Sequence, residues 1–459
     1  MSSPLNPLTF PLHNIRLIEA SAGTGKTTTV TKLLAALQQQ AEGKLTIALT
    51  APTGKATARL TESIVGALSQ LPTSSAAHLP TRAMTLHRLL GVQLHHQSFR
   101  HHAGRPLVED VVVVDEASMV DLELMAALMQ ALRPEARLIL LGDKDQLASV
   151  EAGAVLGELC RGAEQGGYDD ATLKQMQPYT TADLTPWQGE GSRINQATVM
   201  LRHSYRFGGA IGQLAMAVNR GEIEQSLQQL RASEGAESSL RWVQLKRVND
   251  NALKTVVIEA MGRWLKTISV TGSGDEEARQ LLQQLRQFQL LCALKEGEWG
   301  ASEMNRHIKA WLQQADRVAS GHEWYVGRPV IVLRNNYALG LMNGDVGITL
   351  RRADGQLRVA FERLPKSGTK REIQWVLPSR LGEVESSYAL TVHKSQGSEF
   401  DHCALLLPPY TTPLLTRELL YTAITRAKSR FTLFAAKRQV LAQCIENRIL
   451  RSSGLAEGL

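Results

Sequence analysis

The chain has 459 residues, of which 43% are hydrophobic and 21% are charged, with a formal net charge of +7. Because one hydrophobic core stops growing at about 250 to 300 residues, this length predicts two large domains. No window approaches the roughly 18 uninterrupted apolar residues of a membrane-spanning helix, and Met1 to Pro11 lack the pattern of a secretory signal. We therefore expect a cytoplasmic protein without a membrane role, and the excess of basic residues suits a polyanionic partner.

Short β-rich runs alternate with longer helical patterns in the first third of the chain, which is typical of βαβ units and a parallel sheet. The expected strands are Arg16–Glu19, Leu45–Thr50, Val111–Val114 and Arg137–Leu141. A polar or glycine-containing loop follows each of them, and open α/β sheets bind ligands beyond the carboxyl ends of their strands. We predict an α/β ligand-binding domain over residues 1–160.

A change in composition follows this domain. Residues 161–191 are rich in Gly, Gln, Asp and Thr and contain Pro178 and Pro186, which predicts a linker or surface loop over residues 161–200. Residues 201–459 then form a second α/β domain. Its expected helices are Leu201–Gly221, Asn251–Thr267 and Met304–Gln314, and its expected strands are Phe288–Leu294, Ser387–Val392, Cys403–Leu407 and Arg430–Ala435.

Residues 323–385 have a different pattern from the rest of the second domain. Short alternating runs are separated by turn sequences, Asn343-Gly344-Asp345 and Ala353-Asp354-Gly355. Such turns between alternating runs favour antiparallel hairpins. We predict a small β-barrel-like insertion in the second domain.

The loop from Ser21 to Thr27 follows an expected strand and precedes a helical run, the context of a Walker A loop. Backbone amides of Ser21, Ala22, Gly23, Thr24 and Gly25 would cradle phosphates. Lys26 would reach the β- and γ-phosphates of ATP, and the Thr27 hydroxyl would ligate Mg²⁺. Ala20 stands where the first glycine of this pattern is usual.

Two further loops carry polar groups at the ends of expected strands. Val111–Val114 runs into Asp115 and Glu116, one carboxylate to hold Mg²⁺ and a second to orient or deprotonate water. A helix-capping role for the aspartate is the alternative. Residues 140–147 end another strand, where the Gln146 amide could sense the γ-phosphate.

The remaining metal-type residues do not form a site. Cysteines 160, 292, 403 and 444 are far apart without a Cys-x-x-Cys pair, so we expect buried thiols rather than disulfides or a zinc site. Histidines 95, 96, 101 and 102 lie in a polar stretch without accompanying carboxylates or cysteines, which indicates a solvated loop. No clustered acidic constellation outside the ATPase motifs indicates a nuclease.

Taken with the Walker loops, several segments resemble motifs of superfamily-one helicases, and among these the RecD subunits of bacterial exodeoxyribonuclease V. They are 49–56 (LTAPTGKA), 85–91 (TLHRLLG), 204–207 (SYRF), 291–297 (LCALKEG), 327–330 (GRPV), 391–400 (TVHKSQGSEF) and 420–428 (LYTAITRAK). The resemblance runs from about Gly23 to the C-terminal region. It implies two RecA-like P-loop NTPase domains with parallel sheets, ATP between them, and an SH3-like β-barrel insertion in the second.

The resemblance also implies functions for individual residues. Arg206 and Arg426 would be arginine fingers, and Gly397 would contribute to nucleotide binding. Thr53, Lys55, His87, His393 and Ser395 match positions that face DNA, although His393 could instead be structural. The implied activity is ATP-dependent unwinding of DNA with 5′-to-3′ movement on single strands, in break repair and recombination, together with RecB and RecC subunits.

The beginning of the chain departs from this pattern. RecD subunits carry an N-terminal docking domain, whereas about twenty residues precede the loop here, and residues 12–27 resemble the start of RecB. His13-Asn14 stands where an adenine-reading glutamine would be expected. Two alternatives therefore stay open: a truncated or chimeric protein that binds DNA or a partner without hydrolysing ATP, and a freestanding helicase acting on DNA or RNA.

Overall fold

The computed structural model describes residues 15–20, 25–71, 76–93, 98–147, 155–179, 181–201, 209–232, 238–269, 272–336, 338–363 and 371–449. These residues form two compact units, one containing the described residues up to 201 and the other those from 209 to 449. None of their helices combines the length and the apolar character needed to cross a membrane.

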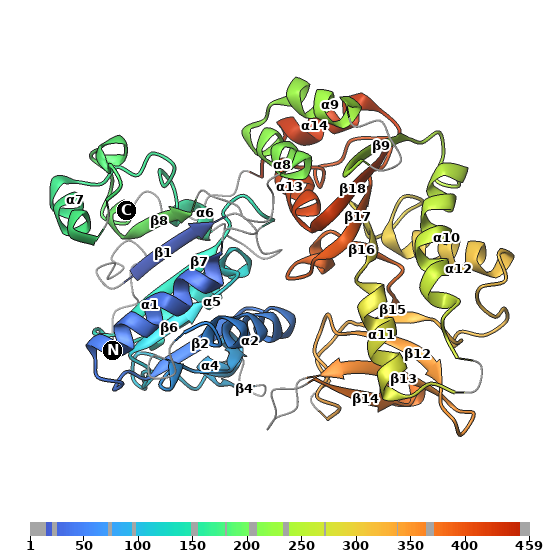
Figure 1. Cartoon of the computed structure of the whole chain (residues 1–459), viewed down its shortest axis with the longest axis horizontal. Helices are drawn as coiled ribbons and strands as arrows, with labels where there is room; N and C mark the ends of the chain where they lie inside the picture. The colour runs from blue at the N-terminus through green and yellow to red at the C-terminus, as the bar shows by residue number, and fades with distance from the viewer. Residues whose placement is uncertain are drawn as a thin grey trace. The chain divides into compact units, whose positions relative to one another are not determined.

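The first unit is built on a six-stranded parallel sheet with the order β3-β2-β6-β7-β1-β8 (Figure 1). The strands are β1 (Ile15–Ala20), β2 (Ile47–Ala51), β3 (Ala83–Thr85), β6 (Val111–Val114), β7 (Arg137–Gly142) and β8 (Thr198–Leu201). The strand β6 coincides with the predicted one, and the ends of β1, β2 and β7 lie within two residues of their predicted positions.

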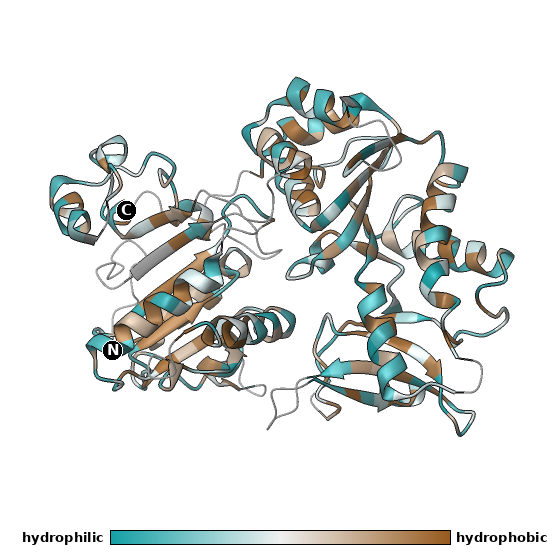
Figure 2. Cartoon of the chain, viewed as in Figure 1, coloured by the Kyte–Doolittle hydropathy of each residue, from teal (hydrophilic) through white to brown (hydrophobic). Residues whose placement is uncertain are grey.

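Helices cover both faces of this sheet. On one face α1 (Lys26–Gln40) and α2 (Gly54–Leu68) share a core with alternate strand residues, and on the other α4 (Leu86–Leu90), α5 (Leu122–Ala131) and α6 (Val155–Leu159) do the same. All four valines of β6 are therefore buried, which β-branched residues in a doubly covered strand favour. The hydrophobic colour of the sheet behind α1 is visible in Figure 2.

The segment predicted to be a linker, residues 161–200, contains α7 (Asp170–Met176) and most of β8. Because β8 pairs with β1, this segment contributes an edge strand to the first sheet. A two-stranded ribbon, β4 (Val92–Gln93) with β5 (Ser98–Phe99), completes the strands of this unit among the described residues.

The second unit contains a five-stranded parallel sheet with the order β16-β10-β17-β18-β9. The strands are β9 (Leu240–Gln244), β10 (Phe288–Cys292), β16 (Ala389–Thr391), β17 (Phe400–Leu406) and β18 (Ala427–Ala435). Helices α10 (Asn251–Leu265), α11 (Asp275–Leu285) and α12 (Ala301–Gln314) share a core with one face. Helices α8 (Ala210–Arg220), α9 (Ile223–Ala232), α13 (Arg417–Thr425) and α14 (Arg438–Glu446) pack on the other.

Between α12 and β16 the chain forms an antiparallel sheet with the order β14-β13-β12-β11-β15. Its strands are β11 (Pro329–Val332), β12 (Val346–Arg351), β13 (Leu357–Arg363), β14 (Glu372–Val376) and β15 (Val384–Ser386). It has its own small core of Val330, Val359, Phe361 and neighbours. The predicted two-domain parallel α/β fold is confirmed, while an SH3-like barrel in the insertion stays a prediction.

The four cysteines are buried and form no disulfide, as predicted. Burial raises the pKa of each thiol. They therefore behave as small apolar side chains.

Candidate functional site

Helix α1 begins at the predicted phosphate-binding loop. Its first residue is Lys26, and Gly25 before it has the left-handed φ of 79° that glycine adopts without strain. The Thr29 amide donates to the Gly25 carbonyl at 2.9 Å, so the helix is regular from its first turn. No acidic residue occupies that turn. The positive end of the helix dipole, the Lys26 ammonium and the Thr27 hydroxyl are therefore placed together, an arrangement that suits an anion.

Some predicted residues lie outside the described ones. They are Ser21, Ala22, Gly23 and Thr24 of the loop, the arginine Arg206, and the histidines His95 and His96. Of the other two histidines in that stretch, His102 accepts a hydrogen bond from the Gly104 amide at Nδ1 (3.2 Å), and His101 Nδ1 lies 3.4 Å from the Pro106 carbonyl.

The two carboxylates Asp115 and Glu116 follow the buried strand β6 directly. The Asp115 amide donates to the Thr50 carbonyl of β2 at 2.9 Å, and the Asp115 carboxylate accepts from the Glu116 amide at 2.9 Å. Glu116 has a left-handed φ of 53°, uncommon for a residue with a side chain, and it starts the turn into the short helix Ala117–Met119. Burial and the neighbouring Glu116 raise the pKa of Asp115, against the Lys26 and Arg59 cations.

A third carboxylate, Asp143, follows the neighbouring strand β7. It is buried, and it accepts hydrogen bonds from the Gln146 side-chain amide (2.9 Å) and from the Asp145 backbone amide (3.2 Å). Gln146 is therefore held by Asp143 rather than extended into solvent. Burial raises the pKa of Asp143, while Lys26 opposes this shift.

Lys26 is the cation common to these carboxylates. Its charge lowers the pKa of both Asp115 and Asp143, so its ammonium lies close to both. The three residues come from segments that follow β1, β6 and β7, and β7 pairs with each of the other two strands. The carboxyl edge of the first sheet thus combines one helix N-terminus, one ammonium and buried carboxylates, as expected for a phosphate and metal site.

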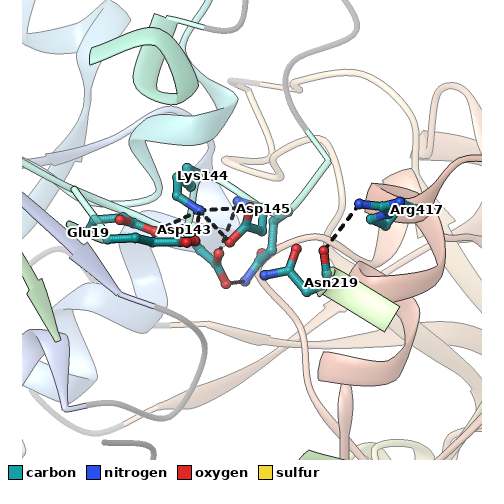
Figure 3. A network of polar contacts seen from close by, with 8 residues as sticks. Glu19, Asp143, Lys144, Asp145, Asn219 and Arg417 are labelled. Carbon is teal, nitrogen blue, oxygen red and sulfur yellow. Dashed lines mark hydrogen bonds and ion pairs between the residues drawn. The ribbon is translucent and has the colours of Figure 1, made fainter. Parts of the chain in front are cut away.

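A second ammonium, that of Lys144, connects the end of β1 to the loop after β7 (Figure 3). It lies 2.9 Å from Asp145, 3.1 Å from Glu164 and 3.6 Å from Glu19. The Glu19 side chain is 1% exposed, and its Oε2 has no hydrogen-bond partner among the described residues. Burial raises the pKa of Glu19 to about 7, since Lys144 compensates only in part.

Replacing Glu19 with glutamine is expected to stabilise the fold at alkaline pH. Because the pKa of Glu19 is raised from 4.5 to about 7 on folding, the folded state favours the protonated carboxyl. The contribution of the protonated Glu19 carboxyl to the free energy of unfolding is complete below pH 4.5 and is lost as pH rises through 7. The variant should therefore exceed the natural chain in unfolding free energy by up to about 3 kcal/mol above pH 7, with little difference near pH 5.

Urea unfolding of both chains across this pH range measures the difference. Glu164→Gln is the matched control, because Glu164 contacts the same ammonium but its side chain is 55% exposed. A Glu19→Gln advantage that does not change with pH would contradict the assignment to ionisation.

In the second unit, Arg426 follows the last residue of α13 and is 2% exposed. Its Nη1 donates to the Ser398 carbonyl at 3.2 Å and its Nε to the Thr422 carbonyl at 3.3 Å. The Arg426 carbonyl in turn accepts from the Phe400 amide at 2.9 Å. The guanidinium thus joins α13 to the loop that contains Gly397, a buried glycine with a left-handed φ of 70°.

The predicted DNA-facing residues occupy loops and helix starts. Thr53 is the N-cap of α2, where its hydroxyl accepts from the Ala56 amide at 3.2 Å, and Lys55 lies half-buried in the first turn. His87 is exposed on α4, and His393 is half-buried after β16. Ser395 is fully buried and its hydroxyl donates to the Val392 carbonyl at 2.6 Å. Their contacts with DNA stay predictions.

Two residues near the site were not selected from the sequence, namely Glu19 and Asp143. Asp143 ends a buried strand in the same way as Asp115, and that parallel could have identified it. Nothing in the sequence pattern indicates that Glu19 is buried beside Lys144, because the strand register that brings them together is a property of the sheet.

Comparison with known proteins agrees with this geometry. Residues 11–152 match the family described as AAA domain, and residues 386–434 match the UvrD-like helicase C-terminal domain. The chain is 40% identical over 453 residues to the RecBCD enzyme subunit RecD of Mycolicibacterium smegmatis, covering 97% of this chain and 73% of that protein. The chain belongs to the RecD family. The resemblance inferred from the motifs, to superfamily-one helicases and RecD in particular, is thereby confirmed.

Other relatives extend the RecD family comparison. The chain is 31% identical to the ATP-dependent RecD2 DNA helicase of Deinococcus radiodurans, covering 91% of this chain and 46% of that protein. Among solved structures, a Pif1 helicase from Bacteroides is 16% identical with a TM-score of 0.43, covering 94% of this chain and 90% of that one. The AAA match contains Lys26, Asp115 and Gln146, and the UvrD-like match contains Arg426.

Proposed function

We propose that this RecD-family chain is an ATP-dependent DNA helicase subunit that moves 5′ to 3′ on single-stranded DNA. It acts with RecB and RecC subunits of an exodeoxyribonuclease V in double-strand break repair and recombination. The observation that carries the proposal is the shared environment of Lys26, Asp115 and Asp143 at the carboxyl edge of the first sheet. Membership of the RecD family supports the choice of DNA as the substrate.

The residues at this edge fit a magnesium nucleotide. The Thr27 hydroxyl and the Asp115 carboxylate are the hard oxygen donors that Mg²⁺ prefers, and Mg²⁺ usually takes one or two protein donors besides phosphate oxygens and water. Burial and Glu116 raise the pKa of Asp115, so the nearby cations do not fully balance the negative charge of its carboxylate. A divalent cation would supply the missing positive charge. When bound, Mg²⁺ neutralises charge on the transferred phosphoryl group.

Each side chain of the site then has one task. Lys26 binds the β- and γ-phosphates, Glu116 accepts a proton from the attacking water, and Gln146 senses the γ-phosphate from its position on Asp143. Amides of residues 21–25 hold the phosphates, and Gly397 adds a nucleotide contact. Arg206 and Arg426 act as arginine fingers that stabilise transition-state charge.

The DNA track is made of Thr53, Lys55, His87, His393 and Ser395. Hydroxyl, ammonium and imidazole groups contact phosphates without reading sequence, which suits a motor that must act on any strand. Buried Ser395 contributes through its hydroxyl oxygen, which can accept a hydrogen bond while it donates to Val392.

The proposal is tested by ATP hydrolysis of the purified chain with and without single-stranded DNA. Stimulation by DNA is expected, and strand displacement on substrates with either a 5′ or a 3′ tail then gives the direction of movement. Absence of stimulation, both alone and with RecB and RecC added, would reject the motor function and leave a binding role.

Replacing Glu116 with glutamine is expected to separate binding from hydrolysis. The variant keeps the hydrogen-bonding shape of the side chain but cannot accept the proton of water, so hydrolysis should fall about 10²- to 10⁴-fold. Nucleotide affinity, measured by fluorescence of a labelled ATP analogue, should stay unchanged. Asp121→Asn is a suitable control, since Asp121 caps the nearby helix α5 through the Leu124 amide. Equal hydrolysis by both variants would contradict the role of Glu116.

A further inference from the structure

One end of the parallel sheet in the second unit carries arginines that no carboxylate neutralises. Arg241 on β9, Arg263 on α10 and Arg430 on β18 are all exposed. Within the described part of the chain, none of them forms an ion pair or a side-chain hydrogen bond. Some other exposed arginines of the unit have partners, as Arg438 with Glu224 and Arg306 with Glu303, whereas Arg247 and Arg380 have none among the described residues. The three arginines differ from these because they gather at one place.

The strand register places two of these arginines on one face of the sheet. Arg430 is the partner of His402 on β17, and Arg241 is the partner of Thr432, two residues further along β18. Paired residues in neighbouring strands, and residues two apart in one strand, point to the same face. This is the face that α10 covers, since Ala404 and Leu406, which share it with His402, pack in the core with α10. Arg263 is on that helix.

His402 lies at the centre of the group. Its Nε2 is 2.9 Å from the Thr432 hydroxyl, and its ring packs edge-on against Phe288 with centroids 5.0 Å apart. Burial, and after it the charges of Arg430, Arg263 and Arg241, lower the pKa of His402 to about 4. Each guanidinium is thus close enough to act on the same imidazole, which stays neutral at physiological pH. Like charges gathered without a counter-ion are unfavourable until an anion binds.

The group lies near the amino ends of the strands, on the face of the sheet that α10 covers. His402 and Arg430 are near the starts of β17 and β18, and Gly397 and Arg426 precede the same two strands, so both sets of residues lie at this end of the sheet. The faces of the sheet separate the two sets, because α10 packs on the arginine face, whereas α13, which Arg426 follows, packs on the opposite face with α8 and α14.

The surface composition favours a nucleic-acid phosphate chain over a protein as the occupant. Arginine forks bind phosphate oxygens in pairs. A protein interface usually has an apolar centre, yet none of the exposed large apolar side chains in the described residues belongs to β9, β17, β18 or α10. Phosphate contacts do not read the base sequence of the nucleic acid. Three side chains of the same type, all arginine, suit such contacts.

We propose that Arg241, Arg263 and Arg430 form a second nucleic-acid contact, which binds the phosphate backbone of DNA that extends beyond the strand held by the motor. We call these residues the arginine cluster. The choice of DNA rests on the proposed function, whereas the site itself rests on the register and on the missing counter-ions.

The test compares a variant with all three cluster arginines replaced by glutamine and a control of equal charge. The control replaces Arg137, Arg161 and Arg193 of the first unit, which are exposed and have no side-chain partner among the described residues. DNA affinity is measured against salt for a strand of about 10 nucleotides, the size of a single-strand site, and for a duplex with a single-stranded tail. Loss of two or three phosphate contacts should lower the salt slope for the tailed duplex by about 2 to 3.

The short strand should bind the cluster variant as it binds the natural chain, and should stimulate its ATP hydrolysis equally. An unchanged salt slope with the tailed duplex overturns the proposal, as does an equal fall in the control. Weaker association with RecB and RecC without any change in DNA binding would instead identify a protein interface, which also overturns it. If the short strand does not stimulate ATP hydrolysis by the natural chain, the proposed function is rejected, and the arginine cluster is still tested by the salt slopes.

A separate measurement checks the geometry. Removing the three positive charges should raise the pKa of His402 from about 4 toward its ordinary value, as followed by NMR of histidine-labelled protein. A constant pKa in the variant would show that the arginines do not surround His402, and would overturn the proposal independently of DNA binding.

Discussion

Replacing Lys26 with alanine is expected to lower DNA-stimulated ATP hydrolysis about a thousand-fold, the scale of losing one preorganised charge at a reacting phosphate. Lys26 is the cation that acts on both Asp115 and Asp143. Without the Lys26 ammonium, less positive charge would offset the repulsion between these carboxylates and the triphosphate. Nucleotide affinity should therefore fall as well. Hydrolysis is measured at saturating DNA, and affinity by equilibrium binding of a labelled nucleotide.

The matched control for this variant is Lys32→Ala. Lys32 belongs to the same helix α1 but is exposed, so its loss removes equal charge and leaves the site unchanged. Hydrolysis by Lys32→Ala should match that of the natural chain. If Lys26→Ala retained DNA-stimulated hydrolysis within a few-fold of that control, the phosphate-binding interpretation of this loop would be wrong.

Replacing Arg426 with lysine is expected to lower hydrolysis by about 10³-fold, the lower range for an arginine finger. Lysine keeps the positive charge but cannot donate to two acceptors in the planar geometry of guanidinium. The structure adds a second effect, because Arg426 donates to the Ser398 and Thr422 carbonyls inside the second unit. Each buried acceptor that loses its donor costs about 1 to 3 kcal/mol of stability.

The two effects of Arg426 are separated with Arg417→Lys. Arg417 also donates to backbone carbonyls of this unit, to Ile445 at 2.7 Å and to Asn219 at 3.4 Å (Figure 3). Both variants should lose stability in thermal unfolding, but only Arg426→Lys should lose hydrolysis at temperatures where both remain folded. Equal hydrolysis by the two folded variants would assign Arg426 a purely structural role.

The fold was predictable from the sequence where burial is complete. Val111–Val114 is apolar on both faces because helices cover both sides of the sheet, so its limits could be read without the structure. The edge strand β8 could not be recognised in the same way. It has only four residues, of which Val199 is 43% exposed, and it follows a long polar segment. An edge strand with one exposed face leaves a weak pattern.

The site was predictable to the level of single residues where a motif fixes them, as for Lys26, Asp115 and Gln146. The contacts among them depend on which strands are neighbours, and the sequence order of β1, β6 and β7 does not give that arrangement. Arg426 shows the same limit, since its motif indicates a functional arginine but not the carbonyl acceptors that hold it. The arginine cluster depends wholly on register and carries no motif.

Strand β8 also determines how the first unit can be studied in isolation. It covers the row of amides and carbonyls along β1, the strand that leads into the phosphate-binding loop. A recombinant fragment ending near residue 160 would leave that row exposed, and open strand edges pair with one another and aggregate. A fragment extending through Leu201 keeps the edge closed. The boundary for expressing this ATPase unit is therefore set by its outermost strand, well beyond the last residue of its nucleotide site.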